Sequence, residues 1–508
     1  MYHASFSKNN GINGTGFKFY FNSELCIFVV PSTMINISLK NNVNNPTHVL
    51  VITEKFVNQF GLPDKVNDYF TSEFKQKDKK VLTYNYIGKY VSIIIVDLKK
   101  EKHRLDEELR RHGAVVADGL NAHRAGEVYI YNQTRNSTLS LPAAEGIALA
   151  NYQFLTHKKE DEKKINTLKN VILANTRINE ARLSELKAVC EATLMARDLV
   201  NEPVNFLNAT DLANAFKRMG KQAGFKVEVF NKAKITEQKM GGLLAVNAGS
   251  VDEPTFSIME YKPARPKNKK PYVLVGKGVV YDTGGLSLKP TPNSMDYMKC
   301  DMAGAAAVAS AMYAIAKSKL NVHVIALVPA TDNRPGFNAF APGDIITMMD
   351  GSTVEMLNSD AEGRMILADA LHYAKRYKPE LVIDIATLTG AAMAAIGTQG
   401  IVGMGTAPDR FKKRLIDSGN NVHERIAEFP FWDDYADLLK SEIADQKNMG
   451  GPYAGAITAG KFLSRYTNYP YYHLDIAGPS FLHAKDSYRV KGATGVGVRL
   501  FYDFIKNL

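Results

Sequence analysis

Residues 273–301 read VLVGKGVVYDTGGLSLKPTPNSMDYMKCD, and this run predicts a strand, a tight turn and the start of a helix. Residues 273–275 are apolar and indicate a short buried strand. Gly284 and Gly285 permit a tight turn. Asp282 precedes that turn, in the position where open α/β sheets usually place ligands. Asp301 opens an alanine-rich run with helical composition.

A second group of charged residues follows about sixty positions later, at 358–364, NSDAEGR. Asp360 and Glu362 stand there at the start of another predicted helix. Together with Asp282 and Asp301 they would bring four negative charges into one pocket, and these could not all ionise at close range without cations. Two divalent metals would balance them, and a bridging carboxylate can hold two ions. Taken singly, each residue could instead be an N-cap or a solvated turn residue.

Two longer segments carry a family resemblance. VGKGVVYDTGGLSLKP (275–290) and NSDAEGRMILADAL (358–371) resemble the signature blocks of the leucyl (cytosol) aminopeptidases, which are hexameric dinuclear metallopeptidases. The likeness runs from about Leu199 to the C-terminus, through LVNEPVN, DIATLTGA, HLDIAG and KGATGVGVRLF. It implies an enzyme that removes an N-terminal Leu or another apolar residue from short peptides, using a hydroxide that bridges two metals.

The resemblance also implies roles for the charged residues. The tighter metal would be bound by Lys277, Asp282, Asp301 and Glu362. Asp282 and Glu362 would bridge to a more exchangeable metal that also takes Asp360. We expect zinc, with manganese, cobalt or magnesium as alternatives at the exchangeable position. A lysine ligand must be neutral, and a neighbouring dication can depress its pKa.

Two further residues have implied catalytic roles. Lys289 would stabilise the oxyanion that develops on the scissile carbonyl. Arg364 would hold a bicarbonate ion that acts as the base, because arginine itself stays protonated.

The resemblance places seven residues around the first substrate side chain, and core packing is the alternative for each: Met295, Met298, Asn358, Ala361, Thr387, Leu388 and Gly390. Methionine and leucine would form an adaptable apolar wall. The loop 291–294, TPNS, differs from that of some relatives, so it bears on the shape of the pocket. Relatives assemble as a dimer of trimers, and we therefore expect a homohexamer.

The order of predicted elements indicates an α/β protein. We expect an N-terminal α/β domain at 1–156, a linker and connecting helix at 157–200, and a larger catalytic domain at 201–508. Its strands alternate with helices, which predicts a mostly parallel central sheet sandwiched by helices. The expected strands are 17–30, 48–53, 91–98, 128–131, 226–230, 256–261, 321–329 and 381–386. The expected helices are 100–112, 143–154, 176–199 and 210–223.

Composition limits the remaining possibilities. No apolar run reaches the roughly 20 residues of a membrane span, and the polar N-terminus lacks a signal-peptide core. Three widely spaced cysteines favour a reducing compartment, so we expect a cytoplasmic protein. The net charge of +11 raises a nucleic-acid-binding alternative, but the basic residues are dispersed and favour a solvated surface. Another dinuclear hydrolase, such as a phosphoesterase, is a further alternative, although such sites usually recruit histidines and neither block contains one.

Two short motifs suggest other chemistry. GAITAGK (455–461) approaches a phosphate-binding loop, but Phe462 stands where Ser or Thr is needed. Asp282-Thr283-Gly284 matches the aspartic-protease triplet, which that chemistry needs twice, and no second copy is present.

Overall fold

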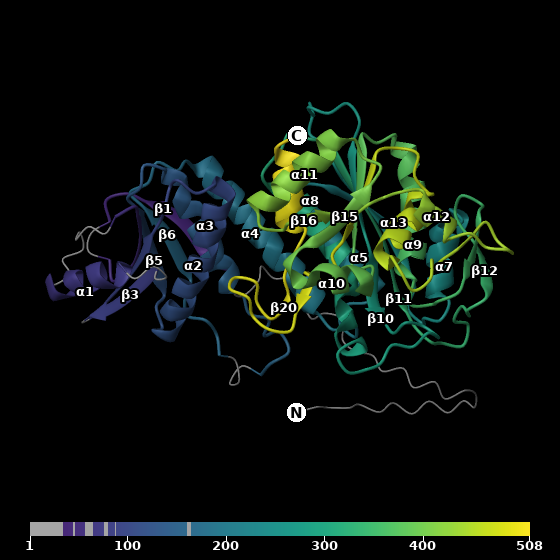
Figure 1. Ribbon diagram of the computed structural model, residues 1–508, viewed down its shortest axis with the longest axis horizontal. Coiled ribbons are helices and arrows are strands. Elements are labelled where there is room, and N and C mark those ends of the chain that lie inside the picture. Colours follow the sequence, from purple (N-terminus) through teal and green to yellow (C-terminus); the bar gives the residue numbers. More distant parts are fainter. Residues whose placement is uncertain (1–33, 44–45, 56–63, 76–79, 87, 160–163) are drawn as a thin grey trace, which may run out of the picture.

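The chain forms two α/β units that lie side by side in the computed structural model (Figure 1). The structure describes residues 34–508 apart from 44–45, 56–63, 76–79, 87 and 160–163. The strand predicted at 17–30 lies outside the described residues.

The first unit is built on a six-stranded sheet with the order β1-β6-β5-β2-β4-β3. β3 and β4 pair antiparallel, and the other described pairs are parallel. The strands are β1 Asn36–Lys40, β2 His48–Thr53, β3 Val81–Tyr86, β4 Lys89–Ile95, β5 Glu127–Asn132 and β6 Asn170–Ala174. β6 falls inside the segment 157–200 that we predicted as linker and connecting helix, and it pairs with β1 and β5. The domain limits themselves remain a prediction.

Three helices belong to this unit: α1 Asp64–Phe74, α2 Lys102–Ala122 and α3 Ser140–Ala150. α2 continues ten residues beyond the predicted end at 112, because Ala114, Val116, Ala117 and Leu120 extend its buried face. Glycines let α2 and α3 approach closely. A Cβ atom at Gly113 would lie 2.4 Å from the Ala143 carbonyl oxygen, and one at Gly146 would lie 2.1 Å from that of Arg110.

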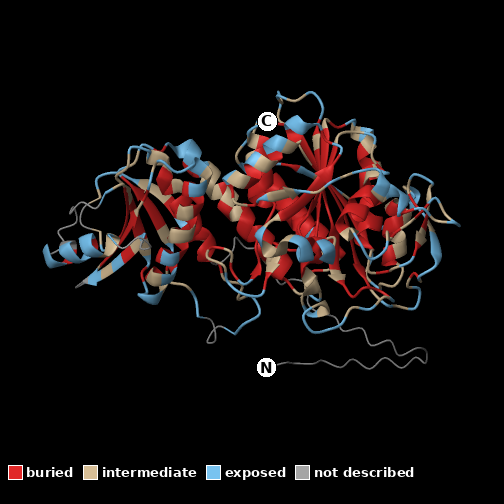
Figure 2. Cartoon of the chain, viewed as in Figure 1, coloured by how far each residue is buried: buried red, intermediate tan, exposed pale blue. Residues whose placement is uncertain are grey.

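The second unit is built on a nine-stranded, mostly parallel sheet with the order β16-β15-β18-β14-β9-β11-β8-β7, in which β10 also pairs with β11. Its strands are β7 Lys226–Phe230, β8 Thr255–Tyr261, β9 Tyr272–Gly276, β10 Gly278–Asp282, β11 Val324–Asn333, β14 Leu381–Ala386, β15 Ile401–Gly405, β16 Ile426–Glu428 and β18 Tyr471–Asp475. Every residue of β11 and β14 is buried, as expected for central strands that are covered on both faces (Figure 2).

Helices cover both faces of this sheet. One face carries α4 Glu180–Asn201, α5 Ala209–Ala223, α8 Ala303–Lys317, α11 Asp409–Asn421 and α14 Val498–Lys506. The other carries α6 Lys232–Glu237, α7 Gly241–Asn247, α9 Gly363–Ala374 and α13 Gly455–Ser464. Successive residues of β9 serve opposite faces: Leu274 packs in the first core, and Val273 and Val275 pack in the second.

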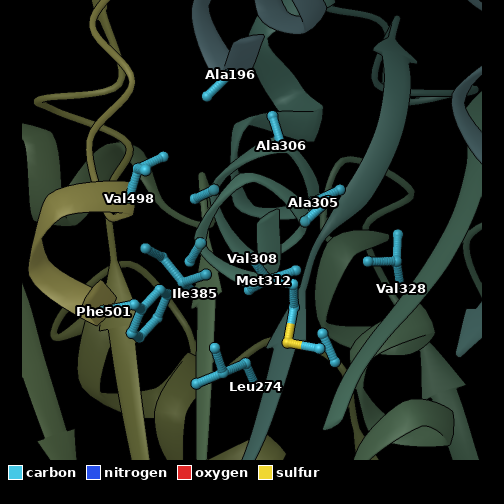
Figure 3. Packing of buried hydrophobic residues seen from close by; sticks show 14 of the residues in the cluster. Ala196, Leu274, Ala305, Ala306, Val308, Met312, Val328, Ile385, Val498 and Phe501 are labelled. Atoms are coloured by element: carbon cyan, nitrogen blue, oxygen red, sulfur yellow. The ribbon is translucent and has the colours of Figure 1, made fainter. Parts of the chain in front are cut away.

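The first core is centred on α8, whose small side chains lie against the sheet (Figure 3). Ala305, Val308 and Met312 are fully buried there. Glycine again permits the closest contact, since a Cβ atom at Gly304 would lie 2.1 Å from the Ile385 carbonyl oxygen and 2.9 Å from the Lys277 nitrogen. This contact brings the start of α8 to the end of β9.

The remaining elements are short; η1 precedes α3 in the first unit, and the others belong to the second unit. They are α10 Gly390–Ile396, α12 Asp434–Asp437, β12 Asp344–Thr347, β13 Thr353–Met356, β17 Gln446–Lys447, β19 Phe481–Leu482, β20 Gly492–Ala493, and the 3-10 helices η1 Ser137–Leu139, η3 Met295–Met302, η4 Lys375–Tyr377 and η5 Gly397–Gln399. The phosphate-loop-like residues 455–461 lie in α13, where Lys461 pairs with Asp433 at 2.9 Å.

The two units are joined by α4 and by buried charges. Leu183 and Leu194 of α4 pack in the core of the first unit, and Met195 and Leu199 pack in that of the second. Beside this helix lies an interunit network made of Glu107, Arg110, Glu145, Glu424 and Arg499. No helix among the described residues is long and apolar enough to cross a membrane.

Candidate active site

The candidate site lies where β10 and β11 end. Asp282 is the last residue of β10 and pairs in register with Asn333, the last residue of β11. The turn after Asp282 contains Gly284 and Gly285 with φ of +84° and +62°, a conformation that glycine adopts readily. The strand predicted at 273–275 is β9, and the predicted turn at Gly284 and Gly285 is present; Asp282 ends a second strand, β10, that the sequence analysis did not predict.

Hydrogen bonds fix Asp282 and join the two acid-bearing segments. Gly284 N–H donates to Asp282 Oδ1 at 2.8 Å, and Asn333 Nδ2 donates to the same oxygen at 2.9 Å. Asn333 Nδ2 also donates to the Ser359 carbonyl oxygen at 2.9 Å. The Ser359 hydroxyl in turn donates to the Gly284 carbonyl oxygen at 2.6 Å. Sequence reasoning missed Asn333 and Ser359, because their role depends on a pairing between segments far apart in the chain.

Three carboxylates meet at this point. Asp282, Asp360 and Glu362 each offer an oxygen, and these oxygens all lie within 4.8 Å of one another. Asp301 adjoins them through Lys277, whose Nζ lies 2.8 Å from Asp301 Oδ2 and 2.8 Å from Glu362 Oε1. The structure therefore brings together all four acids singled out in the sequence, although Asp301 lies in η3, just before the helix that it was expected to open.

Lys289 lies on the other side of the cluster. Its Nζ is 3.0 Å from Asp282 Oδ2 and also pairs with Asp360. Its pKa is raised, because Asp282, Glu362 and Asp360 outweigh the opposing effect of burial. Lys277 is 3% exposed, and Asp301 and Glu362 likewise raise its pKa against the effect of burial.

The carboxylates outnumber the lysines, and their pKa values reflect this excess. Burial and the neighbouring Glu362 raise the pKa of Asp282. Burial raises the pKa of Asp301 well above its usual value, and burial with Asp282 and Glu362 raises that of Asp360 to about 7. Glu362 differs, since Lys277 and Lys289 lower its pKa despite its burial. The cluster therefore holds more acidic groups than its two lysines can neutralise, and without a cation part of that excess is relieved by protonation of the carboxyls.

The cluster fits a divalent cation. Glu362 Oε2 is buried and has no hydrogen-bond partner among the residues that the structure describes. Such an oxygen costs free energy unless something binds it. The atoms that could coordinate a metal are carboxylate oxygens and one lysine nitrogen, and carboxylates suit zinc, magnesium or manganese.

A cavity of about 190 Å³ adjoins the cluster. Four of the seven predicted pocket residues line it: Asn358, Ala361, Leu388 and Gly390. Thr387 lies beside the acids instead, where its hydroxyl donates to Asp301 Oδ1 at 2.8 Å. Met295 and Met298 lie in η3 and are not among the described residues that line this cavity.

The sequence analysis did not assign the other lining residues to the pocket: Thr389, Ala391, Met449, Gly450, Gly451, Gly455 and Thr458. The glycines at 450, 451 and 455 were the available signal for a loop near a ligand. Arg364 also lines the cavity, and its Nη1 donates to the Asn448 carbonyl oxygen at 2.7 Å. Burial lowers its pKa to about 10, and its Nε has no hydrogen-bond partner in the described part of the chain.

Comparisons with known proteins agree with this geometry. Residues 194–502 match the model of the cytosol aminopeptidase family, catalytic domain. The chain is 49% identical over 359 residues to a probable cytosol aminopeptidase of Chlorobaculum parvum, which covers 69% of this chain and 70% of that protein.

Two solved structures share the fold. A tomato leucine aminopeptidase mutant has a TM-score of 0.83 and 26% sequence identity, covering 93% of this chain and 97% of that one. The bottromycin maturation enzyme BotP in complex with Mn has a TM-score of 0.79 and 27% identity, covering 91% and 99%. On the strength of these matches and of the acid cluster in its matched region, the chain belongs to the cytosol aminopeptidase family and is an aminopeptidase, a hydrolase of peptide bonds.

Proposed function

We propose that this enzyme is a two-metal exopeptidase that removes an N-terminal Leu or another apolar residue from short peptides. The observation that carries the proposal is the excess of buried carboxylates beside a cavity, with Glu362 Oε2 left without a hydrogen bond among the described residues. Lys277, Asp282, Asp301 and Glu362 would hold one divalent ion. Asp360 would hold the second, with Asp282 and Glu362 shared.

When bound, the two ions supply Lewis acidity that activates water and polarises a carbonyl. Zinc is the proposed metal, with manganese, cobalt or magnesium as alternatives at the second position. Lys277 would bind as a neutral amine, so its proton must leave. Metal analysis of protein purified without added metal would identify the resident ions.

Lys289 and Arg364 would act on the substrate side. The Lys289 ammonium lies between Asp282 and Asp360, where its charge would stabilise an oxygen that becomes negative in the transition state. Arg364 lines the cavity with a buried Nε that has no partner in the described chain, which supports a role in holding a bicarbonate ion. An arginine cannot accept the proton itself.

The cavity supports a preference for an apolar first residue. Leu388 and Met449 line it, and a substrate carboxylate placed against these two side chains would lose hydration without gaining a partner from them. Of the remaining predicted pocket residues, Asn358, Ala361 and Gly390 lie on the same cavity. Thr387, Met295 and Met298 would act from its edge.

One assay with four substrates tests the proposal. Leu-amide should be cleaved, whereas acetyl-Leu-amide, Asp-amide and an internally quenched blocked peptide should not. The acetyl group removes the amine lone pair that a metal would bind. Because an α-amine has a pKa of about 7.7–8.0, cleavage should increase through mildly alkaline pH. Efficient cleavage of the acetylated or blocked substrate would refute the exopeptidase proposal.

We also propose that the enzyme works in the cytoplasm as a homohexamer, a dimer of trimers, by analogy with its family. Sedimentation would test the assembly, and a stable, active monomer would refute it.

A further inference from the structure

A loop of three residues, 387–389, joins β14 to α10 and lies directly against the acid cluster. Thr387 contacts two of the proposed metal-binding residues. Lys277 Nζ donates to the Thr387 carbonyl oxygen at 3.0 Å, and the Thr387 hydroxyl donates to Asp301 Oδ1 at 2.8 Å. Leu388, the next residue, lines the cavity. The loop therefore contributes one contact to the position of Lys277 and one to that of Asp301.

Asp475 on β18 holds this loop. Its carboxylate is 1% exposed, and both oxygens accept hydrogen bonds from the loop. The Thr389 hydroxyl donates to Oδ2 at 2.7 Å, and Leu388 N–H donates to Oδ1 at 3.2 Å. Ala477 N–H also donates to Oδ1, at 3.1 Å. No other described carboxylate accepts a hydrogen bond from Leu388 or Thr389.

The sheet register explains why Asp475 can reach the loop. β18 pairs parallel with β14, and Asp475 is in register with Ala386, the last residue before the loop. Ile476 N–H continues the pairing by donating to the Ala386 carbonyl oxygen at 2.8 Å. Asp475, the last residue of β18, therefore lies beside Ala386, where β14 ends and the loop begins.

We infer that Asp475 is a positioning residue for the metal site: with Thr389 it fixes the loop 387–389, and through Thr387 it fixes Lys277 and Asp301. The inference rests on the proposed metal site. Groups that orient metal ligands from behind typically contribute 10- to 100-fold to metal affinity. A carboxylate suits this position because it accepts hydrogen bonds on both oxygens, whereas an amide accepts on one.

The test measures Mn²⁺ binding to the metal-depleted enzyme by calorimetry, together with kcat and KM for Leu-amide. Asp475→Asn and Thr389→Val should each weaken Mn²⁺ binding by on the order of tenfold. Thr389→Ser keeps the hydroxyl and should bind Mn²⁺ like the wild type. Thr389→Val also removes the cap of α10, since the Thr389 hydroxyl accepts from Ala392 N–H. The double variant Asp475→Asn/Thr389→Val separates loss of the Asp475 contact from loss of the α10 cap. If both changes act through the Thr389–Asp475 hydrogen bond, their effects on Mn²⁺ binding should not add.

Asp369→Asn is the matched control. Asp369 is also 1% exposed and accepts backbone N–H bonds from Leu243 and Met349, which lie outside the loop 387–389. It should lower thermal stability and leave the Kd for Mn²⁺ unchanged. If Asp475→Asn does not fold, the Thr389→Val and Thr389→Ser pair decides the matter.

The outcomes separate this inference from the proposed function. A wild-type enzyme that neither binds Mn²⁺ nor cleaves Leu-amide would refute the proposed function. A wild-type enzyme that does both, with Asp475→Asn and Thr389→Val as tight for Mn²⁺ as Asp369→Asn, would refute only the positioning role.

Discussion

Two buried clusters of charged side chains can be compared in this molecule. One is the acid cluster at the ends of β10 and β11, and the other is the interunit network. In the network, Glu145 accepts hydrogen bonds from Arg110 at 2.7 Å and from Arg499 at 3.1 Å. Burial opposes ionisation of Glu145, but the two arginines outweigh it and lower its pKa. In the acid cluster the pKa values of Asp282, Asp301 and Asp360 are raised instead.

The difference between the clusters lies in the hydrogen-bond donors that their carboxylates receive. Every carboxylate of the interunit network accepts hydrogen bonds from protein donors: Glu107 from Arg111 and Tyr488, Glu145 from two arginines, and Glu424 from two backbone N–H groups. The acid cluster has four carboxylates and two lysines, and it retains an oxygen without a hydrogen bond among the described residues. Burial of charge alone therefore does not point to a metal site, whereas carboxylates that meet at one point and keep an oxygen without a protein donor do.

The largest effect should follow removal of a shared acid. Asp282→Ala should lose both metal ions and with them the peptidase activity, because Asp282 is proposed to bind both. Asp360→Ala should lose chiefly the more exchangeable ion. Elemental analysis of both purified variants measures this directly. Full metal occupancy in Asp282→Ala would remove the distinction between the two clusters.

The network should respond in stability rather than in metal content. Glu145→Gln would leave Arg110 and Arg499 buried without their shared carboxylate, and breaking a buried pair in this way costs about 3–5 kcal/mol of unfolding free energy. Denaturant unfolding measures the loss, and metal per folded chain should stay at the wild-type level. A variant as stable as the wild type would show that the network contributes nothing to joining the units.

Lys289 tests whether a lysine of the acid cluster serves the reaction. Lys289→Ala should lower kcat by on the order of 10²–10³ while the metal content stays intact, as expected for a lost oxyanion donor. Steady-state kinetics with Leu-amide provides the measurement. A near-normal kcat would assign Lys289 to charge balance alone, like the arginines of the network.

An exposed ion pair should contribute least to the free energy of unfolding. Lys234 and Glu237 lie 2.7 Å apart on α6, with side chains 42% and 62% exposed. Glu237→Gln should change the unfolding free energy by no more than about 0.2–1 kcal/mol, because water screens such pairs. Thermal unfolding would detect a larger change, which would mean that exposure is a poor guide to the value of charge pairs in this chain.

Local patterns predicted much of the fold. The strands predicted at 273–275, 321–329 and 381–386 correspond to β9, β11 and β14, because strands covered on both faces need continuous apolar sequence, but β11 runs from Val324 to Asn333. The end predicted for α2, at 112, was wrong because the helix continues to Ala122. Its added turns pack small residues against α3, and local sequence does not reveal that packing. The limits of the domains are still a prediction, and β6 illustrates the difficulty, since a strand inside a predicted linker completes the first sheet only through pairing with β1 and β5.

The family and the acids and lysines near the site could be predicted from two sequence blocks, each of which places charged residues directly at strand ends and helix starts. How those blocks meet depends on the folded chain. Asn333 and Ser359 join them, Asp475 reaches the loop after β14, and Met449 completes the cavity from a distant segment. These contacts depend on sheet register and on the close approach of β9 and α8 at glycines, and such long-range geometry leaves no signal within any one stretch of sequence.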